Sequence, residues 1–281
     1  MIPMSERILS ANRLAAIAVN TFRESVRQRF FLLLSLAAIA LGIVAWWLRE
    51  CSSGALQTKF VLDAGFGALT FFGAVVAIVA TAESFSGEIE RKTIMAVLAK
   101  PVWRSEFVLG KLGGILGLLL VFCAASTGFL MVLILWQQMA AGRLPAGESA
   151  EAGHQAYAAL IACGLVQWLR CSVLAALTLL VATCARSSLL AVTSGFAALV
   201  ACSLRSLACD ALRMTGPGWA RGGADIAGVL VPDFELYDVA DRVASGGVLS
   251  PGYLAGITLY SALYVGLFAA LAVFCFRHRE L

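Results

Sequence analysis

Long apolar runs alternate with short charged or turn-rich segments along the whole chain. A helix needs about 20 mainly apolar residues to cross a bilayer core. Six runs meet or approach this length, at about 30–48, 61–82, 112–136, 160–185, 187–204 and 252–276. The pattern predicts an all-α, polytopic membrane protein with six transmembrane helices, forming a single transmembrane domain over residues 1–281.

The fourth run contains one charge, Arg170. The run covers 155–185, and two spans of about 15 residues would each be too short to cross. We therefore expect one long helix. Trp168 and Arg170 are expected near one membrane interface, where tryptophan anchors and arginine reaches water. The alternative is that Arg170 lines a pathway or a subunit interface.

The segment before the first run, residues 5–29, has the pattern of an amphipathic helix. Its apolar positions recur every four residues, at Leu14, Ala18, Phe22, Val26 and Phe30. Polar side chains lie off this line, among them Arg23, Glu24 and Arg27. The pattern predicts a helix that lies on the inner membrane surface. The alternative is a positively charged flank that only fixes the topology.

Composition and charge support the membrane assignment and give an orientation. The chain is 60% hydrophobic and 14% charged, whereas soluble domains carry about 25% charged residues. With the N-terminus inside, 13 lysines and arginines fall on inner segments and 7 on outer ones. Both termini are therefore expected in the cytoplasm of a cell with a bacterial-type inner membrane. Trp46, Trp47 and Trp136 then fall at outer span ends.

Residues 87–111, GEIERKTIMAVLAKPVWRSEFVLGK, carry eight charges between two apolar runs. Residues 83–99 can extend the second span as a helix beyond the membrane. Pro101 cannot sit inside a helix and biases Lys100 away from helical conformation. Ser105 and Glu106 then have the pattern of a cap that starts the next helix. We expect a cytoplasmic helix, a proline turn and a re-entry within the region 83–111.

The remaining segments carry weaker signals. The outer loop, about 205–251, contains several glycine and proline turn signals and a short amphipathic stretch from Pro232 to Val239. Gly113 and Gly117 form a GxxxG pair, with Gly110 and Gly114 beside them, and such residues let helix backbones approach closely.

Motifs for enzymatic chemistry are absent from the sequence. Gly110-Lys111 is followed by leucine, so it is not a phosphate-binding loop, and no HExxH motif occurs. Asp63 and Glu83 lie at opposite ends of the second span, which argues against a proton relay. The eight cysteines are expected to be small packing residues, with a Cys51–Cys209 disulfide left open. We expect no metal, no nucleic acid and no cofactor in this chain.

The 87–114 stretch resembles the signature region of ABC-2 type transporter permeases. The matching pieces are Glu90-Arg91-Lys92-Thr93, Val97-Leu98, Pro101-Val102-Trp103-Arg104 and Gly110-Lys111. The plan of an interfacial helix with Phe22-Arg23-Glu24, six spans and a basic C-terminal end is also similar. The chain is most similar to the branch described as permeases for multi-copper enzyme maturation. It departs at Lys92, where many members have glycine.

The resemblance implies that two permease subunits pair, as a homodimer or a heterodimer, and that each rests on a separate ATPase subunit. That partner would bind ATP and magnesium. Residues 87–105 would form the coupling helix, and the N-terminal helix would flank the same contact. The implied docking residues are Glu88, Glu90, Arg91, Lys92, Thr93, Val97, Leu98, Pro101 and Arg104. Arg170 and Glu83 are the candidates for a pathway or subunit interface.

Two functions follow from this sequence. The first is a permease subunit of an exporter, since no feature for docking an external receptor is visible. The second is a six-span assembly subunit that binds other membrane proteins without transporting. Co-purification of an ATP-binding cassette protein separates the two.

Overall fold

The computed structural model of the chain describes residues 4–27, 29–48, 56–87, 104–140, 148–185, 187–215, 231–239 and 250–277. The described part is built from helices, as the apolar runs predict. The longer elements are α1 (Met4–Val26), α2 (Arg29–Leu48), α3 (Leu56–Ala82), α6 (Arg104–Ala140), α7 (Glu148–Cys184), α8 (Ser188–Ser203), α9 (Arg205–Thr215) and α12 (Pro251–Arg277). Two short helical turns, η2 (Glu83–Gly87) and η3 (Glu235–Tyr237), complete the set.

Four helices in the described part are long and apolar enough to cross a membrane. They run over Val61–Gly87, Ser105–Trp136, Tyr157–Cys184 and Pro251–Arg277. Two shorter apolar helices, Ser35–Val44 and Ser188–Ser203, fall within the expected first and fifth spans. At 1.5 Å per residue, the 16 residues of α8 reach about 24 Å, less than the roughly 30 Å core. The multi-pass helical class is confirmed, and the count of six spans stays a prediction.

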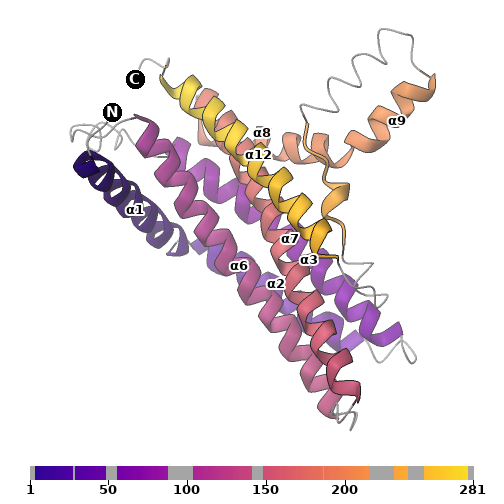
Figure 1. The fold of residues 1–281 in the computed structure, drawn as a ribbon. Coiled ribbons are helices and arrows are strands. Elements are labelled where there is room, and N and C mark those ends of the chain that lie inside the picture. The colour runs from indigo at the N-terminus through magenta and orange to yellow at the C-terminus, as the bar shows by residue number, and fades with distance from the viewer. Residues whose placement is uncertain are drawn as a thin grey trace.

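Helix α7 is the centre of the bundle. It packs against α3, α6, α8 and α12, and Figure 1 shows it running through the middle of the molecule. A helix that is apolar on all faces is typically enclosed by others. Val166, Val173, Ala175 and Leu179 of α7 are accordingly inaccessible to solvent. All but the last residue of the run 160–185, Arg170 included, lies within this one continuous helix.

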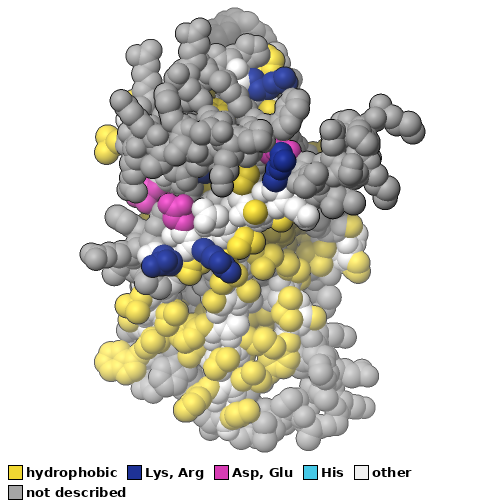
Figure 2. Space-filling model, turned by 90° about the vertical axis from the view of Figure 1, so that its left-hand side faces the viewer, with side chains coloured by type: hydrophobic (Ala, Val, Ile, Leu, Met, Phe, Trp, Pro, Cys, Tyr) yellow, Lys and Arg dark blue, Asp and Glu magenta, His cyan; other side chains and the backbone are white. Residues whose placement is uncertain are grey.

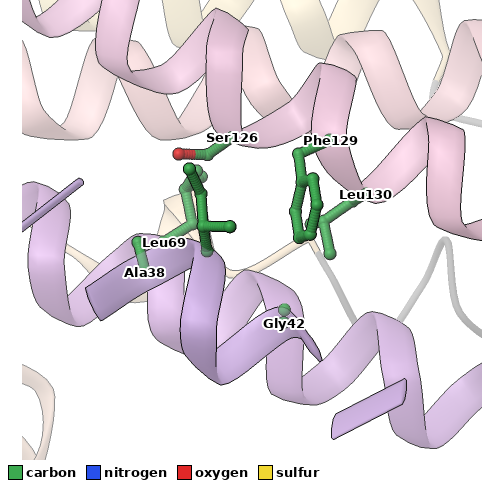
Figure 3. Close-up of a pocket in the computed structure, with 8 residues that line it drawn as sticks. Ala38, Gly42, Leu69, Ser126, Phe129 and Leu130 are labelled. Atoms are coloured by element: carbon green, nitrogen blue, oxygen red, sulfur yellow. The ribbon is translucent and has the colours of Figure 1, made fainter. Parts of the chain in front are cut away.

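Glycine permits a close approach where α2, α3 and α6 meet. Figure 3 shows Phe129 of α6 pointing toward Gly42 of α2, with Leu69 of α3 and Ser126 of α6 beside them. A Cβ atom at position 42 would lie 2.9 Å from the Phe129 ring, closer than packed carbon atoms allow. A glycine at position 42 therefore lets α2 lie directly on α6.

The outside of the bundle is apolar over a broad area. Figure 2 shows hydrophobic side chains covering the lower part of one side, with described charged side chains above them. Trp47 at the end of α2 and Trp136 toward the end of α6 are 74% and 64% exposed. An exposed apolar surface of this extent is typical of a protein that lies in a bilayer.

The segment between α8 and α12 differs in detail from the expected loop. Its first described residues form a helix, α9 (Arg205–Thr215), which the turn signals did not predict. The stretch Pro232–Val239 contains a single 3₁₀ turn, η3, rather than an amphipathic α-helix. Its aromatic residues Phe234 and Tyr237 are buried against the bundle. Burial of these rings, rather than helical periodicity, determines the conformation here.

Candidate functional site

Lys111 is buried where α3 and α6 meet, at the two ends of the segment 88–103. It lies two turns into α6, and only 2% of it is exposed. Its Nζ donates a hydrogen bond to the backbone carbonyl of Ser84 and lies 5.0 Å from the centroid of the Phe107 ring. A buried ammonium is costly unless such contacts compensate its charge. Lys111 thereby joins the end of one span to the start of the next.

The acceptor of this hydrogen bond belongs to a π-helical turn. Residues Glu83–Gly87 continue α3 with a wider turn, a feature frequently found at functional sites. The turn presents the Ser84 carbonyl to α6 and the Ser84 hydroxyl to α1, where Ser25 Oγ lies 3.3 Å from Ser84 Oγ. Ser25 is 1% exposed, so α1 is in direct contact with the turn.

Three phenylalanines close the same junction. Phe85 of η2 and Phe276 of α12 make a T-shaped contact with ring centroids 5.4 Å apart. Phe107 of α6 stacks on Phe276 at 6.2 Å. Aromatic pairs in these geometries contribute about 0.5–1.5 kcal/mol beyond their buried area. We call Ser25, Ser84, Phe85, Phe107, Lys111 and Phe276 the Lys111 junction.

The glycines at the start of α6 form the groove in which α1 lies, and Figure 1 shows the two helices side by side. A Cβ atom at Gly110 would lie 2.8 Å from Ile17, and one at Gly114 would lie 2.6 Å from the carbonyl oxygen of Ala18. At Gly113 and Gly117 the same atom would be 3.7 Å from its neighbours. The closest approach to α1 is therefore at Gly110 and Gly114, not at the neighbouring pair Gly113 and Gly117.

The predicted site residues divide into three groups. Residues 88–103, and with them Glu88, Glu90, Arg91, Lys92, Thr93, Val97, Leu98 and Pro101, lie outside the described residues, as does the side chain of Arg104. Phe22 of α1 packs toward the core, while Arg23, Glu24 and Arg27 are exposed. Glu83 is half-buried and opens η2, so it lies beside the Lys111 junction. Arg170 lies elsewhere.

Arg170 lies halfway along the span Tyr157–Cys184, not at its end. The expected position near an interface therefore differs from the structure. Its guanidinium carbon is 5.1 Å from the centroid of the Phe234 ring, and the side chain lines a hollow between α3, α7 and α8. Trp168 also points inward, because its indole N–H donates a 3.1 Å hydrogen bond to the Leu116 carbonyl of α6.

The segment 231–239 forms the outer wall beside Arg170. Tyr237 shares a 2.7 Å hydrogen bond with Ser261 of α12, and the Asp233 amide donates to Tyr260 Oη at 2.9 Å. Arg205 of α9 and Asp233 form an ion pair at 2.9 Å. Burial raises the pKa of Tyr237 to about 12. These contacts hold the segment 231–239 against α12 and α9.

Sequence reasoning passed over several of these residues. Lys111 was noted as part of a signature, yet its place in the apolar start of α6 was already a signal of a buried partner. Ser25 and Ser84 carry no comparable signal, because isolated polar residues are common in apolar helices. Only the packing of distant segments reveals their contacts.

The described residues contain no group of three or more His, Cys, Asp or Glu side chains that could hold a metal ion.

A family model described as ABC-2 family transporter protein matches residues 15–206. No curated protein matches the chain. The matched range begins within α1, includes the segment 88–103 and Lys111, and ends in α9, so it covers more than half of the chain. The chain therefore belongs to the ABC-2 family of transporter proteins, as a multi-pass membrane permease subunit.

Proposed function

We propose that this chain is the permease of an ABC exporter and that a separate ATPase subunit, which binds ATP and magnesium, docks on residues 87–105. A second permease subunit, identical or related, completes the transporter. Both termini and the docking segment then face the cytoplasm of a bacterial-type inner membrane. The family match supports the transport role. The Lys111 junction is the observation that supports the proposal that an ATPase drives the permease through residues 87–105.

The Lys111 junction can transmit a mechanical displacement to the spans. A soluble motor can act on a membrane protein only through a segment outside the bilayer that is firmly attached to the spans. Segment 88–103 follows η2 and precedes α6, and the Lys111–Ser84 hydrogen bond ties these two attachments together. A displacement of the segment would therefore move α3 and α6 as one unit instead of spreading them apart.

Helix α1 is coupled to the same movement. It contacts η2 through Ser25 and lies in the glycine groove of α6. The exposed side chains of Arg23, Glu24 and Arg27 are on the other face of α1. This arrangement supports a role for α1 as a second surface for the ATPase, beside the coupling segment.

Purification from the native membrane in mild detergent tests the proposal. An ATP-binding cassette protein should co-purify with the tagged chain in a stoichiometric amount, and ATP hydrolysis should depend on that protein. If only other integral membrane proteins co-purify, the chain is an assembly subunit and the transport proposal is wrong.

A further inference from the structure

Two pairs of cysteines bring thiol groups together from helices that are distant in the sequence. Cys184 of α7 and Cys275 of α12 are in hydrogen-bonding contact through their thiols. Cys123 of α6 and Cys171 of α7 make the same kind of contact. All four side chains are free thiols. Each pair therefore places a thiol of the central helix against a thiol of a neighbouring span.

Solvent access separates the two pairs. Cys123 and Cys171 are 2% and 1% exposed, so a dissolved reagent does not reach them in the folded chain. Cys184 is exposed and Cys275 is partly exposed. Oxidation of cysteine depends on access, and redox-sensing cysteines are often accessible thiols that lie beside a second thiol. Of the two pairs, Cys184 and Cys275 have this arrangement.

The accessible pair lies where two spans end. Cys184 is the last residue of α7, and Cys275 is two residues before the end of α12 at Arg277. Helices α7 and α12 pack against each other, so their ends carry the two thiols side by side. In the proposed orientation this end of the bundle faces the cytoplasm, where a water-soluble oxidant reaches it.

Cys275 is also directly attached to the Lys111 junction. The next residue, Phe276, contacts Phe85 of η2 and Phe107 of α6. A covalent bond from Cys275 to Cys184 would tie this part of the junction to α7, the centre of the bundle. Because η2 and α6 flank the coupling segment, such a bond would restrain the movement that an ATPase imposes on them.

We propose that Cys184 and Cys275 form a reversible disulfide that slows the transporter under oxidising conditions. The oxidant is a small-molecule disulfide of the glutathione type. The Cys184 thiolate attacks one of its sulfurs and expels a thiol, which leaves a mixed disulfide on Cys184. The Cys275 thiolate then attacks the Cys184 sulfur and expels the second thiol. The two cysteines lose two electrons and two protons, and the oxidant is reduced to two thiols.

The compartment determines what such a bond can do. Cytoplasmic thiols are kept reduced, and the disulfides that do form there are usually transient and catalytic or redox-sensing. A bond between Cys184 and Cys275 is therefore suited to a temporary brake, not to permanent stabilisation. The brake rests on the proposed function, because the step that it slows is ATP hydrolysis coupled through the Lys111 junction.

Mass spectrometry of the oxidised protein tests the bond. The full chain, purified with its ATPase and placed in lipid nanodiscs, is treated with oxidised glutathione, digested and measured without reduction. The peptides of Cys184 and Cys275 should be linked, and dithiothreitol should separate them. The link should be lost in Cys184→Ser and in Cys275→Ser but kept in Cys171→Ser. Glutathione on Cys184 without a link to Cys275, or no reaction of either thiol, would overturn the proposal.

The rate of ATP hydrolysis by the same complex tests the brake. Oxidation should lower the rate of the parent, and dithiothreitol should restore it. Cys184→Ser and Cys275→Ser should keep their rates under the oxidant. Cys209→Ser, which removes a partly exposed thiol on α9, should respond as the parent does. An equal loss of rate in Cys184→Ser and Cys275→Ser would place the effect on another thiol and overturn the brake.

The two measurements separate this inference from the proposed function. If the link forms and the rate of ATP hydrolysis is unchanged, the brake is wrong while the transporter proposal stands. If no ATPase co-purifies, the transporter proposal and the brake both fail, and the peptide link still decides whether the thiol pair forms a disulfide.

Discussion

The Nζ atom of Lys111 donates a hydrogen bond to the backbone carbonyl of Ser84, 27 residues earlier in the chain. The bond connects the start of α6 to the π turn that ends α3. The bond therefore forms a fixed base that joins the two described elements on either side of residues 88–103.

Replacing Lys111 with methionine tests this base. The apolar stem is kept, but the Ser84 carbonyl loses a donor, which costs about 1–3 kcal/mol when the acceptor is buried. Removing a buried charge offsets part of that cost, so global stability should change little. Hydrogen exchange of the amides in Glu83–Gly87 should become faster. Leu109→Met, on the exposed side of α6, should leave the exchange as it is; equal rates in Lys111→Met and the parent would contradict the role of Lys111.

The packing of α1 in its glycine groove predicts a contrast between two alanine variants. Gly114→Ala places a Cβ atom 2.6 Å from the Ala18 carbonyl oxygen, whereas at Gly266 of α12 nothing lies within 4 Å. Overpacking of this kind typically costs about 1–3 kcal/mol. Gly114→Ala should lower the thermal unfolding temperature in detergent. Gly266→Ala should leave it unchanged or raise it, since alanine favours helix; equal effects would show that α1 does not pack here.

The orientation of the chain is tested by cysteines at two positions. Lys92→Cys should react with a membrane-impermeant maleimide only from the cytoplasmic side, and Asp233→Cys only from the outside. The parent chain, treated in parallel, corrects for labelling of its own cysteines. Labelling of both new cysteines from one side would mean that the proposed topology is wrong.

Tyr237 makes stability depend on alkaline pH. Burial raises the pKa of its phenol to about 12, above the roughly 10 of an unfolded tyrosine. The neutral phenol is the form that the fold favours. Its contribution is complete below about pH 10 and is lost as the pH rises toward 12. Tyr237→Phe should therefore lose less stability than the parent between pH 9 and 11.5, measured by chemical unfolding in detergent. An identical pH dependence in both chains would show that the phenol is not buried as described.

The apolar runs predict the helices well, because a bilayer forces every backbone polar group of a span to be paired within its own helix. The continuous helix around Arg170 follows from this constraint. The surroundings of Arg170 do not follow from it. The length of an apolar run cannot show that Phe234 and Asp238, from another part of the chain, lie beside this side chain.

The contacts between helices were less predictable. Four glycines at 110, 113, 114 and 117 mark a close approach, but the sequence does not say that the partner is α1 or which pair is tightest. The π turn at Glu83–Gly87 has no glycine or proline signature of its own at its start. Its Ser84 carbonyl accepts a hydrogen bond from Lys111, which reaches it from another helix.

The most direct test of the account is ATPase association after a change on the coupling segment. Val97→Asp together with Leu98→Asp places two charges where an apolar docking surface is proposed. Leu207→Asp with Ala208→Asp, on exposed positions of α9, is the matched control on the opposite side of the proposed topology. The account predicts that the first pair abolishes co-purification of the ATP-binding cassette protein and the second leaves it intact. Undiminished co-purification with the first pair would contradict docking on residues 87–105.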